Sequence, residues 1–403
     1  MTRTQVDIFI SGGGIAGLIC AAAFAHSGYS VLLADPQTPD ISDGSAQRDL
    51  RSTAYLQPAQ ALLADIGIWQ NLDPIAVPLD ALRIVDTTGT PPQLRDERAF
   101  RADDLGQQPF GWNILNWEML RQLRQLVAHT PNITLRYGVG FRGLVTRTTG
   151  AFVTLSDNSQ ISARLVVGAD GRNSRVRDAA GIAAHTTRYG QKSLAFSAAH
   201  LIPHENISTE IYHRGGPFTM VPLADVDGLP ASAIVWMNEG RRTHALAEMG
   251  PDDFNREMTE RAVGLFGPMR LISDRAIWPI ITQRAARLTA ERTVLIAEAA
   301  HVLPPIGAQG LNTSIQDIAA LIGCAQNAND LGDAAMLASY SKQRDSDIRR
   351  RARVIDLFNR VTRSGDTGLQ AIRLAGLKAV HDIAPLRHQI MRRGMGATYS
   401  AKT

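Results

Sequence analysis

Hydrophobic and polar positions in the first third of the chain follow two patterns in turn: short apolar runs, which predict strands, and helical periodicity, which predicts helices. An apolar run over residues 5–10 predicts a strand, a helical pattern continues to about Ser27, and a second strand covers residues 31–33 and ends at Asp35. Short continuous apolar runs are typical of strands that helices cover on both faces. The pattern therefore predicts an α/β domain that opens with a strand–helix–strand unit.

The same two patterns continue up to about residue 167. The predicted helices lie at about 58–66 and 116–128, and the predicted strands at about 82–86, 111–115, 133–137, 152–155 and 161–167. Residues 78–105 are otherwise polar and rich in turn-forming residues. These elements extend the α/β domain with further strands and helices.

Residues 185–285 have a different pattern, in which apolar and polar positions alternate. The alternation predicts strands near 194–199, 210–213, 218–221, 233–237 and 276–281, with one helix near 252–265. Strict alternation is typical of an antiparallel sheet with one buried face. We expect this sheet to lie over the first domain and to roof a pocket there.

The C-terminal part is helical and basic. Helices are predicted from Asn312 to about Gln326, over about 333–362 and over 368–384, where Pro385 interrupts the pattern. From residue 341 onward the chain has 14 Lys/Arg and 5 Asp, a net charge of +9. The last segment is either a helix packed on the body or a helix lying at a membrane interface. We expect no contact with nucleic acid, because no nucleic-acid-binding module is recognisable.

Composition narrows the class of protein. The 403 residues allow two or three domains, and no apolar run approaches the length of a membrane span. The start of the chain has no leader pattern, which predicts a cytoplasmic protein. The two cysteines, Cys20 and Cys324, fall in apolar helical patterns and are expected to be core residues. The ten histidines have no metal-ligand spacing, so no metal is predicted.

The first motif carrying chemistry is Gly12-Gly13-Gly14-Ile15-Ala16-Gly17, a G-x-G-x-x-G turn between the first strand and helix. In this motif Gly12 makes the tight turn, Gly14 lets a pyrophosphate approach, and Gly17 lets the helix and sheet pack closely. Asp35 lies 23 residues after the first glycine and can accept ribose hydroxyls. The motif predicts a dinucleotide site; the alternative is a tight turn alone.

A second acid–glycine turn, Asp170-Gly171, follows the strand predicted at 161–167, and Ser174 and Arg177 open a short helix. Asp170 either caps that helix or contributes a second contact to the dinucleotide. Arg51 is either an exposed loop charge or a cation beside the same ligand.

The third motif begins after the apolar run 293–296 and includes Glu298, His301, Pro304 and Pro305. The prolines stiffen a loop, and the two glycines that follow, Gly307 and Gly310, let the backbone approach a flat ligand. The helix that follows aims its N-terminus, which favours an anion, at the same place. The alternative is an ordinary strand–loop–helix connection.

Together the three motifs resemble those of the flavoprotein aromatic hydroxylases, the single-component group related to para-hydroxybenzoate hydroxylase. The stretch Ala-Ala-His-Val-Leu-Pro-Pro-Ile-Gly-Ala-Gln-Gly-Leu-Asn and the ending Met-Arg-Arg-Gly-Met-Gly are similar to the branch that hydroxylates ubiquinone precursors. The chain departs from the group at Asp35, where Glu is usual, and at Ala297-Glu298, where Gly-Asp is usual.

The resemblance implies FAD as cofactor and NADPH or NADH as a transient reductant. It implies that Gly12, Gly14, Gly17 and Asp35 hold the ADP half, that Arg51 and Asn116 contact the middle of FAD, and that Asp170 and Gly171 serve the pyrophosphate region. It places Glu298 at the ribityl chain and the residues Gly307, Gln309, Gly310, Leu311 and Asn312 along the flavin ring, with Pro304 and Pro305 beside it. It assigns no general base.

The implied reaction transfers one oxygen atom from a flavin C4a-hydroperoxide to the ring of a polyprenyl phenol in ubiquinone biosynthesis. Alternatives are a hydroxylase of a soluble aromatic compound, a FAD-dependent reductase of prenyl double bonds, and a non-catalytic lipid-binding scaffold. The expected partners are a hydrophobic phenolic substrate, the inner membrane surface through the basic C-terminal segment, and other ubiquinone-biosynthesis proteins.

The resemblance also predicts the domain organisation. A discontinuous, Rossmann-like FAD-binding domain would comprise residues 1–75, 106–184 and 286–330. An antiparallel substrate-binding sheet would comprise 76–105 and 185–285, and a C-terminal helical segment would comprise 331–403.

Overall fold

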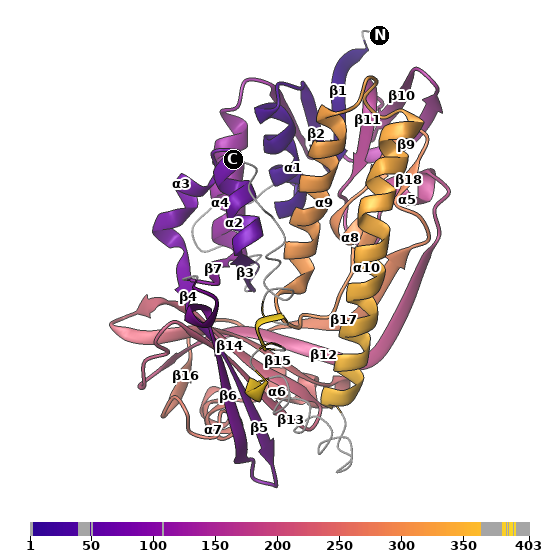
Figure 1. The fold of residues 1–403 in the computed structure, drawn as a ribbon. Helices are drawn as coiled ribbons and strands as arrows, with labels where there is room; N and C mark the ends of the chain where they lie inside the picture. The colour runs from indigo at the N-terminus through magenta and orange to yellow at the C-terminus, as the bar shows by residue number, and fades with distance from the viewer. Residues whose placement is uncertain are drawn as a thin grey trace.

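Two sheets, joined by a layer of helices, form the framework of the protein (Figure 1). The computed structural model describes residues 3–38, 49, 51–106, 109–363, 381–383, 385, 387–389 and 391. The mixed α/β architecture predicted from the sequence is confirmed, including the long helix after residue 333.

The first sheet has the strand order β18-β19-β11-β1-β2-β8, and β10 and β9 continue from β11. Its strands are β1 (Thr4–Ser11), β2 (Val31–Asp35), β8 (Ile133–Tyr137), β9 (Phe141–Arg147), β10 (Gly150–Leu155), β11 (Gln160–Gly168), β18 (Thr289–Ala290) and β19 (Thr293–Leu295). The central strand β1 pairs in parallel with β2 on one side and β11 on the other. The chain order reverses across β1, so a ligand crevice is expected at the carboxyl ends of these strands.

Helices cover this sheet, and the most buried of them is α1 (Ile15–His26). It contacts β1, α4 (Asn116–Ala128) and α9 (Gln309–Gln326), and its small residues fit between these layers. The other helices on this side are α2 (Gln57–Asp65), α3 (Trp69–Leu72), α5 (Arg175–Ala179) and α8 (Ala297–Ala300), with the 3₁₀ turn η1 (Asp73–Ile75).

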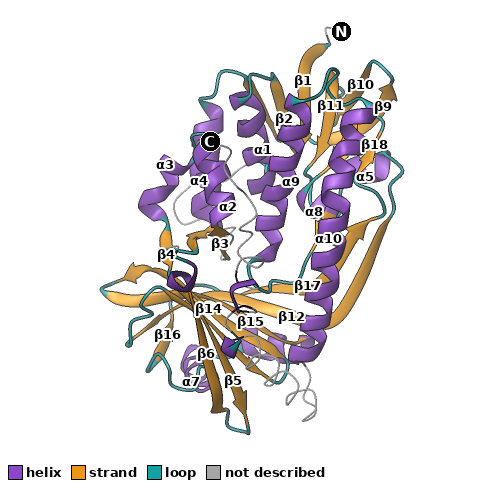
Figure 2. Ribbon diagram, viewed as in Figure 1, coloured by secondary structure: helices purple, strands orange, loops and turns teal. Residues whose placement is uncertain are grey.

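The second sheet has the order β20-β17-β12-β15-β14-β13-β5-β6, with β16 paired to β12. Its strands are β5 (Ala81–Thr88), β6 (Gln93–Arg101), β12 (Ala184–His200), β13 (Ile207–His213), β14 (Gly216–Val226), β15 (Leu229–Glu239), β16 (Met269–Leu271), β17 (Ala276–Ala285) and β20 (His301–Val302). One face packs on α6 (Gly240–Glu248) and α7 (Pro251–Arg261) through a core that includes Phe196, Trp236 and Phe254. The other face looks toward the first sheet (Figure 2).

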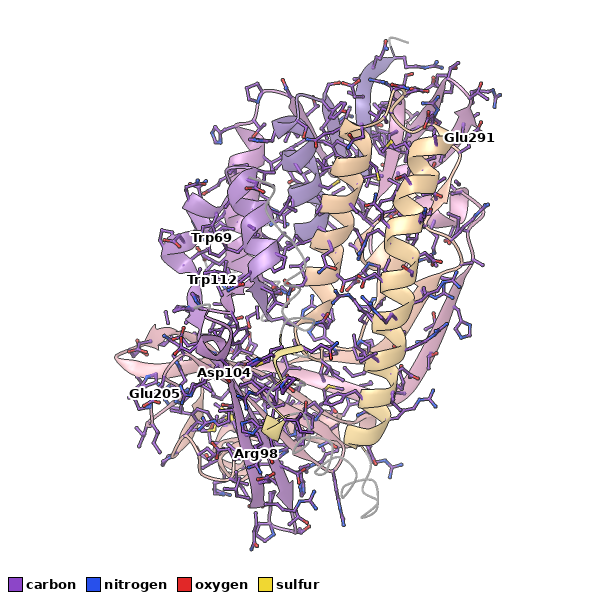
Figure 3. All side chains as sticks on the ribbon, viewed as in Figure 1. Trp69, Arg98, Asp104, Trp112, Glu205 and Glu291 are labelled. Atoms are coloured by element: carbon purple, nitrogen blue, oxygen red, sulfur yellow. The ribbon has the colours of Figure 1, made fainter. Side chains whose placement is uncertain are left out.

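A small third sheet lies between the two large ones. It consists of β3 (Ser52–Leu56), β7 (Gly111–Leu115) and β4 (Val77–Leu79), and η2 (Ala102–Leu105) lies nearby in the chain. Trp69 of α3 and Trp112 of β7, both labelled in Figure 3, meet edge to face with ring centroids 5.1 Å apart. This contact fixes α3 to the small sheet.

The 30-residue helix α10 (Ala334–Arg363) spans the height of the molecule beside α9 and reaches the second sheet (Figure 1). The Tyr340 hydroxyl donates to the Leu295 carbonyl at 3.0 Å near one end, and the Tyr189 hydroxyl donates to Asp356 at 2.6 Å near the other. The helix therefore clamps the two sheets in one relative position. Among the described residues, none of the helices is both long and apolar enough to cross a bilayer.

Two elements differ from the sequence-based expectation. Helix α9 begins at Gln309, three residues before the predicted start at Asn312. The polar stretch expected to be turn-rich contains the nine-residue strand β6. This strand is at the edge of the sheet, where charged residues keep other chains from pairing with it, so it lacks a clean apolar alternation. The helix predicted over 368–384 falls mostly outside the described residues.

Candidate functional site

The glycine turn after β1 owes its shape to two close backbone contacts. Gly12 has φ +113°, and a Cβ added to it would lie 2.4 Å from the Ala169 carbonyl oxygen. A Cβ on Gly17 would lie 1.9 Å from the Gly12 carbonyl oxygen. A Cβ on Gly14 would meet nothing within 4 Å, because this residue borders open space. The first and third glycines of the motif are thus required for packing, and the second leaves room for a ligand.

Asp35 lies at the carboxyl end of β2 and braces the same turn. Its Oδ2 atom accepts the Gly13 backbone N–H at 2.6 Å, and its Oδ1 atom accepts the Gln37 N–H at 2.8 Å. The carboxylate is therefore held beside the turn, and its contact with a ribose stays a prediction.

The Asp170 carboxylate caps a helix. One oxygen accepts the Arg175 and Val176 backbone N–H groups at 2.8 and 3.1 Å, and the other accepts the Ser174 hydroxyl. Burial raises the pKa of Asp170, although these hydrogen bonds oppose the rise. Gly171 and Arg172, which follow it, line the cavity described below. Asp170 therefore acts as the cap of α5, which is one of the two roles expected from the sequence. A contact of this turn with a cofactor would come from the neighbours of Asp170.

Arg177 connects this turn to the third motif. Its buried guanidinium donates to the Arg172 carbonyl at 3.0 Å and to the Ala299 carbonyl at 3.3 Å. The Gln283 side chain also donates to the Arg172 carbonyl, at 2.9 Å, from the second sheet. Two segments more than 120 residues apart in the chain are therefore fixed to each other.

The third motif surrounds a buried carboxylate. Asp317 is fully buried, and it accepts hydrogen bonds from His301 at 2.6 Å, from Arg344 at 2.8 Å and from the Ala297 backbone N–H at 3.1 Å. Burial alone would raise the pKa of Asp317, but His301 and Arg344 outweigh burial and lower it. His301 is therefore held by Asp317, and Glu298 is exposed toward the cavity. Ala297 itself has φ +54°, a left-handed conformation that favours glycine.

The loop before α9 is held from two sides. Gly307 and Ala308 both have positive φ, at 60° and 54°. The Gln309 side chain donates to the Gly307 carbonyl at 2.9 Å and accepts a hydrogen bond from Arg351 of α10. Pro305 lines the cavity, whereas Pro304 lies behind it and accepts the Ile306 N–H at 2.8 Å. The loop is thus fixed in shape before any ligand binds.

Asn312 uses its whole amide to hold β3 against α9. Its Oδ1 atom accepts the Leu56 N–H at 2.9 Å, and its Nδ2 atom donates to the Ala54 and Ala308 carbonyls at 2.7 Å. Asn312 is not among the residues that line the cavity. Its predicted contact with a flavin ring stays a prediction, and the structure gives it a bracing role.

Arg51 and Asn116 form a polar cluster around Asp49. Arg51 pairs with Asp49 at 2.7 Å, and the Asn116 amide donates to Asp49 at 3.0 Å. The Arg51 guanidinium also lies over the Trp278 ring of the second sheet, 4.0 Å from its centroid. Burial opposes the charge of Arg51, but Asp49 and Glu298 raise its pKa. Arg51 is therefore a fixed cation that bridges the two halves of the site.

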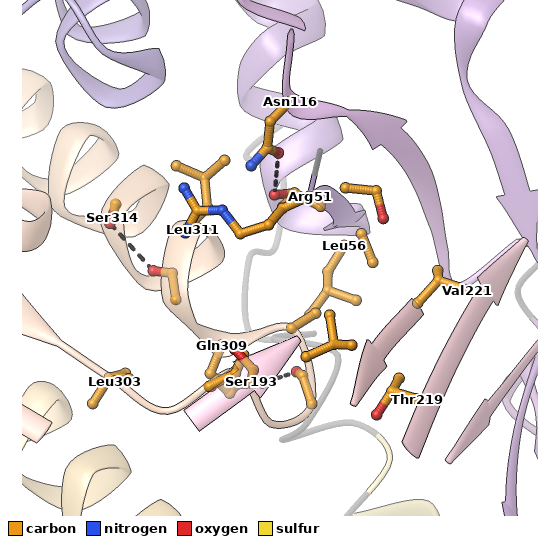
Figure 4. A pocket seen from close by; sticks show the side chains of 18 of the residues that line it. Arg51, Leu56, Asn116, Ser193, Thr219, Val221, Leu303, Gln309, Leu311 and Ser314 are labelled. Atoms are coloured by element: carbon orange, nitrogen blue, oxygen red, sulfur yellow. Dashed lines mark hydrogen bonds between the residues drawn. The ribbon is translucent and has the colours of Figure 1, made fainter. Parts of the chain in front are cut away.

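One cavity of about 1120 Å³ joins all three motifs. Four of their glycines border it with nothing within 4 Å of an added Cβ: Gly14, Gly171, Gly307 and Gly310. Figure 4 shows Arg51 and Asn116 on one side of the cavity and Thr219 and Val221 on the strands of the second sheet. The predicted residues that line the cavity are Gly14, Arg51, Asn116, Gly171, Glu298, Pro305, Gly307, Gln309, Gly310 and Leu311.

These features fit FAD. The glycine turn and the N-terminus of α1 border the cavity at Gly14, where a pyrophosphate would fit, and Arg51 adds a fixed cation to the same cavity. The loop of Gly307 and Gly310 leaves backbone open to a flat ring at the other end. The volume exceeds the roughly 300–1,000 Å³ of pockets that hold one small ligand. The cavity therefore has room for a dinucleotide and a second molecule.

The second sheet roofs this cavity with alternate residues of its strands. Those on the cavity side include Leu82, Ile84, Asp86, Phe100, Ser193, Ala195, Ser208, Glu210, Tyr212, Thr219, Val221, Val235, Trp278 and Ile280. Sequence reasoning identified the strands but singled out none of these side chains. One sequence signal could have identified two of them. Glu210 and Tyr212 are two residues apart in a strand with alternating polarity, so both side chains lie on the same face of the sheet.

Comparison with known proteins identifies relatives over nearly the whole chain. Residues 5–353 match the family model described as FAD binding domain. The chain is 30% identical to ubiquinone hydroxylase UbiL of Rhodospirillum rubrum, covering 97% of this chain and 89% of that protein. It is 26% identical to 3-demethoxyubiquinol 3-hydroxylase of Escherichia coli, covering 98% of this chain and 100% of that protein.

Solved structures agree on the fold. The p-nitrophenol 4-monooxygenase PnpA of Pseudomonas putida superimposes with a TM-score of 0.77 at 16% identity, covering 100% of both chains. At this identity the similarity concerns the fold alone. The resemblance to flavoprotein hydroxylases and to their ubiquinone branch is thereby confirmed, as is FAD as the cofactor.

Proposed function

The chain belongs to the FAD binding domain family, as a FAD-dependent aromatic-ring monooxygenase, and from this premise we propose that it hydroxylates the ring of a polyprenyl phenol in ubiquinone biosynthesis. The reductant is NADPH or NADH, and the second product is water. The names of the ubiquinone hydroxylases of Rhodospirillum rubrum and Escherichia coli support this substrate class.

The observation that carries the proposal is an apolar path from the roof of the cavity to the surface. Three cavity-lining residues of α10 are exposed apolar side chains: Val354 at 62%, Leu357 at 65% and Phe358 at 38%. Inside, Ile84, Phe100 and Val221 continue the apolar lining. With the phenol ring of the substrate at the loop of Gly307, its prenyl chain would lie along α10 and contact apolar side chains.

The residues of this chain divide the work of the reaction. FAD held by the glycine motifs supplies the chemistry that activates oxygen when NADPH or NADH has reduced it. Arg51 and Glu298 would hold the polar part of the cofactor, and the loop around Gly307 would border its flat ring. The roof of β12 to β15 excludes water from the cavity. This exclusion is needed because a reactive oxygen donor decays in contact with water.

The test uses the full chain purified with FAD. With NADPH or NADH and a prenylated phenol, we expect oxygen consumption coupled to a product that gains one oxygen atom, measured by mass spectrometry. Faster coupled turnover of a soluble phenol would favour the alternative of a soluble aromatic hydroxylase. A colourless preparation that takes up no flavin would favour a scaffold, and prenyl reduction without oxygen uptake would favour a reductase.

We also propose that α10 and the basic C-terminal segment dock the protein on the cytoplasmic face of the inner membrane, where a prenylated substrate resides. Helix α10 has eight Lys/Arg and three Asp, so its net charge is +5. Arg350 and Arg360 are largely exposed around the apolar patch of Val354, Leu357 and Phe358. Cations beside exposed apolar side chains favour anionic lipid surfaces.

Part of the basic segment has another role. Arg344 is buried against Asp317. The described end of the chain returns to β6, where Met391 packs on Phe100, and to η2, where Arg387 lies 3.5 Å from Asp104. Among the described residues, docking is therefore assigned to the exposed patch of α10.

Leu357→Asp should lower sedimentation of the protein with anionic liposomes, and Leu94→Asp, an exposed apolar control on β6, should not. Equal binding of both variants and the wild type contradicts docking through α10. Contacts with other ubiquinone-biosynthesis proteins remain a proposal that co-purification would test.

A further inference from the structure

A buried carboxyl group lies in the roof of the cavity, next to the loop assigned to the flavin ring. Glu210 and Tyr212 are two residues apart on β13, so both side chains point to the cavity side of the sheet. Their exposed fractions are 7% and 2%. The Tyr212 hydroxyl donates to Glu210 Oε2, and Gly307 of the loop lines the same cavity as Glu210.

The surroundings of Glu210 offer its charge little compensation. Within the part of the chain that the structure describes, no Lys, Arg or His forms an ion pair with it. The nearby carboxylate on β5, Asp86, pairs instead with Arg95. Burial raises the pKa of Glu210, although the Tyr212 hydroxyl and the Gly307 backbone oppose the rise. A buried carboxyl group without a cation destabilises the fold, so its presence here calls for a function.

We propose that the Glu210 carboxylate is the proton acceptor for the phenolic hydroxyl of the substrate, with Tyr212 as the positioning residue that orients it. This role rests on the proposed hydroxylation of a phenol. Glu210 on the roof and Gly307 on the loop line one cavity, so the carboxyl group faces the space that the loop borders. A ring seated below the roof and against that loop would bring its hydroxyl within reach of the carboxylate.

The proton transfer is balanced within the site. The phenolic O–H bond breaks, its proton forms a new O–H bond with the carboxylate, and the electron pair stays on the phenolic oxygen. The carboxylate becomes a neutral acid while the phenol becomes a phenolate, so the charge of the site is unchanged. The phenolate pushes electron density into the ring, which makes it a better acceptor of an electrophilic oxygen atom. The proton leaves to water when the product departs.

Other residues around Glu210 set its environment. Thr219 of β14 and Ile84 of β5 lie opposite it in the sheet, and Phe358 of α10 contacts the Tyr212 ring at 5.8 Å. The other charged or titratable groups that line the cavity are Asp49, Arg51, Asp86, Arg172, Glu298 and His301. Among these, Asp49, Asp86 and His301 are each engaged with another side chain.

The first experiment is the pH profile of turnover by the FAD-loaded full chain. The wild-type kcat/KM should rise with pH as Glu210 loses its proton, with a midpoint above the ordinary value of 4.5. Glu210→Gln should lower kcat by about 100-fold or more, with little change in KM. It should also remove the rising limb of the pH profile, which is the increase of kcat/KM with pH. Glu210→Asp should recover part of the rate. Glu97→Gln, an exposed carboxylate on β6, should match the wild type.

Tyr212→Phe separates positioning from proton transfer. Loss of its hydrogen bond disfavours the carboxylate, so the midpoint of the limb should move to higher pH while most of the rate at high pH is kept. A purely structural role of Glu210 predicts lower FAD content in Glu210→Gln and an unchanged limb, and this result would overturn the proposal.

A second readout needs no turnover. When 4-nitrophenol is added to the oxidised holoenzyme without reductant, the absorption of its phenolate should appear at lower pH in the wild type than in Glu210→Gln. Identical titrations would overturn the role of Glu210. A wild type that converts no phenol contradicts the proposed function, whereas an active wild type whose Glu210→Gln variant keeps rate and pH profile contradicts only the role of Glu210.

Discussion

Two sides of the cavity are built in different ways: the motif side, formed by the three glycine-bearing motifs, and the roof side, formed by the second sheet. On the motif side, backbone contacts and buried ion pairs fix each segment: Gly12 against Ala169, Asp170 on its helix, and Asp317 between His301 and Arg344. On the roof side, single side chains project from a regular sheet. A change on the motif side disturbs several partners at once, whereas a roof side chain can change with little effect on its neighbours. The motif side is therefore suited to an invariant cofactor, and the roof to a particular substrate.

The largest expected effect is that of Asp317→Asn. Removing this charge takes one of two carboxylate partners from the buried Arg344, which keeps Asp347, and the carboxylate partner from the buried His301. The free energy of unfolding should fall by about 3–5 kcal/mol, measured by urea denaturation. The control is Asp345→Asn, whose pair with Arg349 is partly exposed and should contribute less than about 1 kcal/mol. Equal losses would mean that the buried network does not hold the motif side.

The pH dependence of stability sharpens this test. The pKa of Asp317 in the folded protein is below its ordinary value of 3.8, so its contribution is complete above that value and is lost as the pH falls through the folded pKa. The difference in stability between the wild type and Asp317→Asn should therefore be constant above about pH 4 and shrink below it. A difference that shrinks between pH 8 and 5 would point to another group.

The second effect separates two glycines of one turn. Gly17→Ala places a Cβ 1.9 Å from the Gly12 carbonyl oxygen and should cost about 3 kcal/mol of stability. Gly14→Ala meets open space and should leave the stability of the apoprotein within about 1 kcal/mol while weakening FAD binding, measured by flavin fluorescence titration. A stable Gly17→Ala protein with normal FAD content would contradict the packing argument.

The third effect concerns the roof. Val221→Phe fills part of the substrate side of the cavity and should raise KM for the phenol about tenfold, which is about 1.4 kcal/mol, without changing the affinity for FAD. Val145→Phe, an exposed position on β9, is the control for added bulk. A parallel loss of FAD affinity in Val221→Phe would show that roof and motif side are not independent.

The smallest expected effect is a gain in stability, produced by Ala297→Gly. Ala297 has φ +54°, which costs an L-residue about 1–2 kcal/mol, and Ala297→Gly removes this cost while adding about 0.4–1 kcal/mol of unfolded-state entropy. We expect a net stabilisation of about 0.5–1 kcal/mol in thermal unfolding. Ala299→Gly, a buried helical position in the same turn, should destabilise instead. Destabilisation by both substitutions would remove the argument for strain at Ala297.

Much of the motif side could be predicted from the sequence. The strand and helix that flank Gly12 to Gly17 were predicted almost to their ends, and three of the predicted elements, β7, α4 and β8, agree in both bounds. Local backbone chemistry determines such turns, since only glycine fits at Gly12 and Gly17. The start of α9 was predicted late because the left-handed Ala308 that precedes it carries no signal that a sequence pattern reveals.

The roles of single site residues were less predictable. Asn312 was expected at a flavin ring, yet its amide is used entirely in bracing β3, and Asp170 is used in capping α5. Each role depends on a partner far away in the chain, as with Asn312 and Ala54. A polar residue in a motif can serve a ligand or the backbone equally well in chemical terms, and only distances separate the two.

The sequence by itself determined the three glycine-bearing turns, the alternation of buried and exposed positions in the strands, and hence the class of cofactor, because these properties depend on residues that are close in the chain. The tertiary structure alone decided that the three turns border one cavity, that α10 lies along its apolar edge, and that Glu210 of the roof lines the same cavity as Gly307 of the loop. Those placements arise from packing between segments far apart in the chain, such as Leu56 and Asn312, which are 256 residues apart, and no local pattern specifies which surfaces will meet.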